Sequence, residues 1–126
     1  MTAFTVKAID EMQAHFHGAV KLAAAELGIE SFGLQVLDFP PGFTDYPEHD
    51  HAEDGQEEVY VVLRGSGEFE VDGERVSLDP GRMLRVAPEA KRRLEPGADG
   101  IRILAIGSTV EGRYERPADF QLSHAR

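Results

Sequence analysis

Two histidines separated by a single residue, His49 and His51, stand shortly before a segment that begins with the carboxylates Glu57 and Glu58 and continues with β-branched residues. Alternate side chains of an extended strand point to the same face, so both imidazoles can converge on one point. A carboxylate from a strand that pairs alongside can reach that point. Two imidazoles and one carboxylate are a ligand set for a divalent first-row metal that keeps open coordination positions. The pattern therefore predicts a metal site.

The size and composition of the chain favour one compact domain. It has 126 residues, of which 41% are hydrophobic, and its 13 glycines suit a turn-rich fold. Cysteine is absent, which excludes disulfides, thiolate ligands and a cysteine nucleophile. The sequence has no apolar run long enough to span a membrane, and its start lacks the pattern of a secretory signal, so we expect a cytoplasmic protein without a membrane partner.

The formal net charge of −10 argues against nucleic acid as a partner, because nucleic acid requires a positive surface. The charge is uneven, since no lysine or arginine occurs between Lys21 and Arg64. The acidic residues of that stretch are Glu26, Glu30, Asp38, Asp45, Glu48, Asp50, Glu53, Asp54, Glu57 and Glu58. They form either an ordinary solvated surface or an acidic environment that raises the affinity of the two histidines for a metal.

Short β-strand patterns, separated by glycine and proline turns, follow one another along most of the chain. The expected strands are Phe32–Phe39, a strand that begins at His49–His51, Glu58–Leu63, Glu68–Val71, Arg75–Leu78, Met83–Val86, Arg92–Leu94 and Ile101–Ile106. The dipeptide Asp72-Gly73 is the strongest hairpin signal in the sequence. Many short strands at even spacing predict an all-β antiparallel sandwich or barrel.

The N-terminal part is expected to form an extension that contains a short helix. Asp10 is placed to cap a helix that runs to His17. Ala19–Glu26 is ambiguous, because its alanines favour a helix whereas the alternation of its apolar residues favours a strand. The expected division of the chain is an extension over residues 1–34, a barrel over residues 35–111 and an irregular tail over residues 112–126.

The residues around the two histidines resemble the first sequence motif of the cupin family. In that motif a glycine, here Gly42, precedes the histidine pair, and Glu58 and Gly65 follow it. The interval before His49 is one residue longer than in the family, and the interval before Glu58 is two residues longer, both in loops that tolerate added length. The resemblance implies a small cupin, whose double-stranded β-helix or jelly-roll barrel holds a metal through His49, His51 and Glu58.

The second cupin motif is degenerate. Aligned from Gly81, the chain has Ala87, Glu89 and Pro96 at the proline, glycine and asparagine positions of the family. Arg92 stands where the family has its fourth metal ligand, a histidine, and arginine keeps its proton and cannot ligate. An inward Arg92 can pair with Glu58 and take the place of the metal, whereas an Arg92 that points outward or folds past the metal leaves three protein ligands and waters. Glu57 replaces Glu58 as the carboxylate ligand if the strand register differs by one residue.

The resemblance leaves two functions open. In the first, a divalent transition metal (Fe, Mn, Ni or Zn) and a small organic molecule bind in the barrel, and the metal serves an oxygenase or an isomerase as Lewis acid or oxygen activator. Tyr60 and Arg92 then contact the substrate. In the second, no metal is bound, and Arg92 holds a carboxylate or a sugar acid in a binding module without catalysis.

Small cupins also imply a homodimer in which N-terminal strands cross to the partner. The extension carries apolar residues that need a covering surface, namely Phe4, Val6, Ile9, Val20, Leu22 and Leu27. Outside the motifs, Arg85 is expected to be exposed on its strand. The remaining histidines have no partner spacing and are expected at the surface: His15, His17 and His124.

Overall fold

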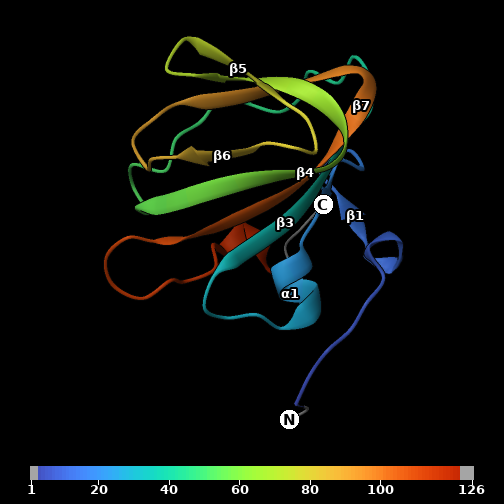
Figure 1. The fold of residues 1–126 in the computed structure, drawn as a ribbon. Helices are drawn as coiled ribbons and strands as arrows, with labels where there is room; N and C mark the ends of the chain where they lie inside the picture. The colour runs from blue at the N-terminus through green and yellow to red at the C-terminus, as the bar shows by residue number, and fades with distance from the viewer. Residues whose placement is uncertain (1–2, 123–126) are drawn as a thin grey trace.

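The computed structural model describes residues 3–122, whose strands form one antiparallel sheet that curls into a barrel (Figure 1). The strands are β1 (Ala14–His15), β2 (Val20–Lys21), β3 (Gly33–Phe39), β4 (Gln56–Val71), β5 (Glu74–Leu78), β6 (Met83–Val86) and β7 (Arg92–Thr109). The helical elements are the 3-10 turns η1 (Ile9–Glu11) and η2 (Ala118–Phe120) and the short helix α1 (Ala23–Leu27). The all-β fold class with one short helix is therefore confirmed.

Two long strands, β4 and β7, form the frame of the barrel and are drawn green and orange in Figure 1. The first half of β4 pairs with β6 and the second half of β7, while the second half of β4 pairs with β5 and the first half of β7. The register of the pairing between β4 and β7 shifts after Val62 and again after Gly65, between the half of β4 that pairs with β6 and the half that pairs with β5. Gly65 has a φ of +78°, and a Cβ there would lie 2.2 Å from the carbonyl oxygen of Gly100, so this crossing requires glycine.

The hairpin predicted at Asp72-Gly73 connects β4 to β5. Both turn residues have a positive φ, 48° at Asp72 and 85° at Gly73, as a two-residue hairpin turn requires. The two predicted strands Arg92–Leu94 and Ile101–Ile106 are parts of one strand, β7. Inward side chains of the strands form the core, among them Phe39, Tyr60, Val62, Phe69, Leu78, Val86, Leu94 and Ile103.

The N-terminal extension differs from the prediction. In place of a helix from Asp10 to His17 there is only η1, followed by β1, which pairs with β2. The Asp10 carboxylate does not cap a helix, because it accepts a hydrogen bond of 2.8 Å from Arg102 in β7. The ambiguous stretch Ala19–Glu26 contains both predicted structures, first β2 and then α1. Strand pairing and an ion pair with a distant strand thus outweigh the local helix preference.

The prediction that His15 lies at the surface is wrong. Its exposed fraction is 2%, because β1 turns alternate side chains inward as it pairs with β2. Within residues 3–122, neither ring nitrogen of His15 finds a hydrogen-bond partner. His17 and Arg85 are exposed, as predicted. His124 lies outside the described residues.

The extension packs against the barrel of its own chain. Ala19, Val20 and Leu22 join the main core, and Arg102 fixes Asp10 and Asp38 through ion pairs of 2.8 and 2.6 Å. Most of the apolar residues that were expected to need a partner surface are therefore covered within one chain. The exceptions lie on the arm at residues 3–8, where 78% of Phe4 and 81% of Val6 are exposed. The homodimer stays a prediction. No helix among the described residues is long and apolar enough to cross a membrane.

Candidate metal centre

The register of β4 decides which of the two neighbouring carboxylates faces inward. Side chains alternate between buried and half-buried from Gln56 to Val62, so Glu58 and Tyr60 point into the barrel. Glu57 points outward and forms an ion pair with Arg85 on β6. Glu58 lies opposite Gly107 of β7, where a Cβ would come within 3.1 Å of the Glu58 side chain. The inward carboxylate of the candidate site is therefore Glu58.

The strand predicted to begin at His49–His51 is not formed. The segment makes an isolated bridge between His49 and Arg92, with backbone hydrogen bonds of 3.0 and 2.9 Å, and the amide of His51 donates to the carbonyl of Pro88. The polar segment that follows turns the chain before a regular strand can develop. These backbone contacts nevertheless hold both histidines beside the mouth of the barrel.

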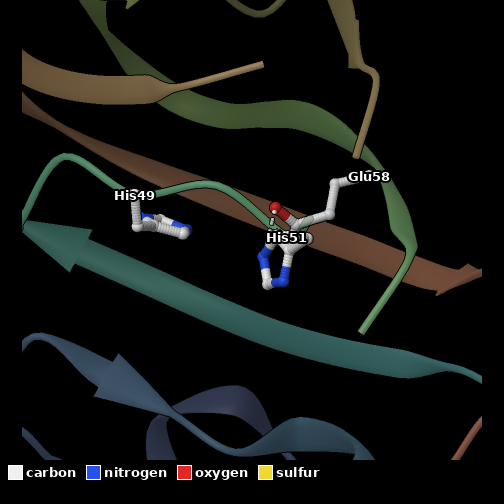
Figure 2. A group of neighbouring side chains, drawn as sticks. All are labelled: His49, His51 and Glu58. Atoms are coloured by element: carbon white, nitrogen blue, oxygen red, sulfur yellow. Dashed lines mark ion pairs between the residues drawn. The ribbon is translucent and has the colours of Figure 1, made fainter. Parts of the chain in front are cut away.

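The three predicted ligands converge. One ligand atom from each of His49, His51 and Glu58 can be chosen so that all lie within 4.8 Å of one another. Figure 2 shows the Glu58 carboxylate directed toward the His51 ring, and Nε2 of His51 lies 3.3 Å from Oε1 of Glu58. Two ligands that are about 2.1 Å from one metal and at right angles lie about 3.0 Å apart. The geometry fits a shared divalent metal.

Hydrogen bonds orient both imidazole rings. Nδ1 of His49 lies 3.0 Å from the carbonyl oxygen of Pro47, and Nδ1 of His51 lies 3.1 Å from the carboxylate of Asp54. Both partners are acceptors and favour a proton on Nδ1, which leaves the lone pair of the neutral His49 ring on Nε2. Nε2 of His51 also faces a carboxylate, that of Glu58, so this nitrogen can ligate a metal only after it gives up its proton. A metal-binding histidine has this arrangement, in which an oxygen acceptor fixes the tautomer of the ligand.

The electrostatic setting keeps the carboxylate charged. Burial alone would raise the pKa of Glu58, but hydrogen bonds from His51 and Tyr60, with the charge of Arg92, hold that pKa below its usual value. The Tyr60 hydroxyl donates to Oε1 of Glu58 over 2.5 Å. Burial lowers the pKa of His49. Burial also acts to lower the pKa of His51, but Glu58 and Asp54 together raise it.

Arg92 points inward and is fully buried. Its Nη2 donates to the carbonyl of Ala87 over 2.9 Å, and its Nη1 lies 3.5 Å from Oε1 of Glu58. Within residues 3–122, its Nε and Nη1 find no hydrogen-bond partner. The guanidinium thus takes the inward position that the sequence left open and pairs with Glu58 at ion-pair distance.

The sequence did not single out two further residues of the site. Asp54 orients His51, and its position three residues after that histidine was the available signal. The ring of Tyr46 meets that of His49 edge-on at 5.4 Å between centroids, and burial raises the pKa of its hydroxyl. No local pattern distinguishes Tyr46 from an ordinary loop tyrosine.

A cavity of about 370 Å³ adjoins the three predicted ligands, all of which contribute to its wall. It lies between β3, the loop that follows β3, the extension and the tail. Its volume is that of a small-molecule site. Neither Tyr60 nor Arg92 is among its lining residues, so their contact with a ligand stays a prediction.

Comparison with known proteins places the chain in a family. The sequence profile of the cupin domain matches residues 35–106, more than half of the chain, and the protein therefore belongs to the cupin family. Among solved structures it is similar to a cupin protein from Bacteroides fragilis, at 27% identity and a TM-score of 0.72, over 89% of this chain and 92% of that one.

Two more distant structures share the fold. KdgF from Halomonas sp. is 15% identical with a TM-score of 0.68, over 85% of this chain and 96% of that one. The DMSP lyase DddQ from Ruegeria pomeroyi is 22% identical with a TM-score of 0.56, over 71% of this chain and 44% of that one. No curated protein sequence matches the chain.

Proposed function

We propose that this cupin binds one divalent transition metal through His49, His51 and Glu58, and a small organic ligand in the adjoining cavity. The observation that carries the proposal is the hydrogen bonding of the two histidines. Each ring directs Nδ1 to an oxygen acceptor, which supports Nε2 as the ligand atom, and the third donor is a carboxylate whose pKa is held low.

The proposed chemistry is that of a metal-dependent oxygenase or isomerase. A bound metal would supply a Lewis acid or an oxygen-activating centre to a ligand that chelates it through open positions. The residues of the chain have supporting tasks in this proposal. Asp54 orients the His51 ring, Tyr60 fixes the Glu58 carboxylate by its hydrogen bond, and the cavity wall keeps bulk water away from the ligand.

A second function has a specific observation in its favour. Arg92 is buried beside Glu58, and its guanidinium is a permanent cation at the ligand position that a histidine fills in other cupins. In this alternative the barrel holds no metal and acts as a non-catalytic binding module for a carboxylate or sugar acid. The convergence of both imidazoles with this carboxylate nevertheless favours the first function.

Metal content tests the proposal. The protein purified without chelator is expected to retain close to one equivalent of a divalent transition metal, measured by plasma emission spectrometry. The double variant His49→Ala/His51→Ala should lose it, while His17→Ala, which removes an exposed imidazole outside the cluster, should keep it. Absence of metal from all three proteins, also after incubation with Fe²⁺, Mn²⁺, Ni²⁺ and Zn²⁺, would favour the metal-free alternative.

A further inference from the structure

Four phenylalanine side chains line the cavity beside the proposed metal site. Phe39 in β3 and Phe43 in the next loop pack with ring centroids 4.7 Å apart, and Phe16 in the extension packs against Phe120 in the tail at 6.2 Å. All four rings contribute to the cavity wall. Rings from four separate segments thus surround a space that opens onto the three predicted metal ligands.

The charges around this cavity have one sign. Apart from Glu58, its acidic lining residues are Asp45 and Asp119, both of which are exposed and therefore lie where the cavity meets solvent. No lysine or arginine of residues 3–122 lines it, because Arg92 lies buried behind Glu58. Along the wall away from the metal ligands, an anionic group on the body of a ligand would meet carboxylates and no lysine or arginine. Such a group is costly to bury without a partner.

The wall contributed by the extension has an unusual backbone. Phe16 and His17 have φ values of 53° and 64°, a region that residues other than glycine rarely adopt, and both line the cavity. Strained backbone persists where the surrounding structure holds it, and it is concentrated at ligand sites. Here the packing of Phe16 on Phe120 holds the turn, and the result is an aromatic ring placed in the cavity wall.

We propose that the ligand is a small molecule that chelates the metal through an oxygen-bearing end and has an uncharged, largely hydrophobic body, which lies between Phe16, Phe39, Phe43 and Phe120. This inference rests on the proposed function, since the metal holds the chelating end. It selects against sugar acids and compact polycarboxylates, whose bodies carry negative charge that this wall does not match. Phe16 and Phe120 are its specificity-determining residues.

Two probes with the same chelating end test the proposal. We would titrate 4-methylcatechol and protocatechuate into the Zn²⁺-loaded protein by calorimetry, since Zn²⁺ does not oxidise catechols. The probes differ only in the group opposite one hydroxyl, a methyl in the first and a carboxylate in the second. We expect 4-methylcatechol to bind at least roughly tenfold more tightly. The double variant Asp45→Asn/Asp119→Asn should narrow that ratio, because both substitutions remove negative charge at the rim.

Substitution in the aromatic wall gives an independent measurement. Phe120→Ala should weaken the binding of 4-methylcatechol by roughly tenfold without loss of bound Zn²⁺. Phe4→Ala removes an equally large ring from the exposed arm and should change nothing. Protein that retains Zn²⁺ but binds protocatechuate as tightly as 4-methylcatechol overturns this inference alone. Protein that retains no Zn²⁺ overturns the proposed function, and this inference with it.

Discussion

Arg92 places a permanent positive charge beside a site that we propose for a cation, so its removal has a large predicted effect. Nη1 lies 3.5 Å from Oε1 of Glu58. A metal bound about 2.1 Å from either Glu58 oxygen would lie within about 8 Å of that nitrogen. At an effective dielectric of 20, a divalent cation and a guanidinium at this distance repel each other by about 4 kcal/mol. Arg92 should therefore weaken metal binding.

Two substitutions at position 92 distinguish the effect of the arginine charge on metal affinity from the effect of an added metal ligand. Arg92→Met removes the charge from a chain of similar length, and we expect it to tighten metal binding at least about tenfold after solvent screening and relaxation. Arg92→His also offers a fourth imidazole and should tighten binding further. Without metal, Arg92→Met removes the permanent cationic partner of Glu58, which should lower the free energy of unfolding by about 3 kcal/mol.

Calorimetric titration with Zn²⁺ and thermal unfolding with and without Zn²⁺ measure both effects. Arg85→Met is the matched control, because it removes a surface arginine whose partner, Glu57, is outside the site. The control should leave metal affinity unchanged. The reasoning is refuted if Arg92→Met and Arg92→His both bind Zn²⁺ with the affinity of the unmodified protein, since the buried charge would then have no influence on the site.

Three further predictions concern pH, the barrel crossing and assembly. The carboxylate neighbours of His51 raise its pKa, so as pH falls, protonation should begin to weaken metal binding already above the ordinary histidine value of about 6.5. Calorimetry should show that Asp54→Asn moves this loss of metal affinity to lower pH. Equal metal affinity at pH 8 and pH 5 would contradict the prediction. Gly65→Ala should lower the free energy of unfolding by at least about 3 kcal/mol, because its Cβ meets a backbone oxygen. The control Gly112→Ala has the same positive φ but open space around the Cβ, and it should lower the free energy of unfolding by about 1 kcal/mol in chemical denaturation. Equal losses of stability in the two variants would contradict the close approach at Gly65. Light scattering at micromolar concentration should give a dimer mass that deletion of residues 1–8 reduces to a monomer mass. A monomer before deletion would contradict the homodimer, and a dimer that persists after deletion would contradict the role of the arm.

Local signals in the sequence were sufficient for much of the barrel. The hairpin at Asp72-Gly73 follows from two residues that tolerate a positive φ, and the inward face of β4 follows from strand alternation. The convergence of His49, His51 and Glu58 was also predicted from spacing and family resemblance, although no regular strand holds the histidines. These features depend on residues that are close in sequence or on a pairing that the pattern itself indicates.

Features that depend on distant contacts were not predictable. Asp10 is an acceptable helix cap by type, but its partner is Arg102, 92 residues away, and the helix does not form. The burial of His15 depends on how β1 lies against the barrel. The inward direction of Arg92 was left open, because a buried guanidinium and an exposed one give the same sequence pattern. The cavity joins four segments of the chain, and although Asp45 belongs to the acidic stretch noted in the sequence, no local pattern brings Asp119 to the same rim.

The central claim is that one divalent metal is bound by both histidines and the inward carboxylate. Anomalous difference density from a crystal grown with Mn²⁺, Ni²⁺ or Zn²⁺ and measured at the absorption edge tests it most directly. We expect one peak about 2.0–2.2 Å from Nε2 of His49, Nε2 of His51 and an oxygen of Glu58. The central claim would be contradicted by the absence of a peak between these atoms, with Glu58 instead paired only to Arg92.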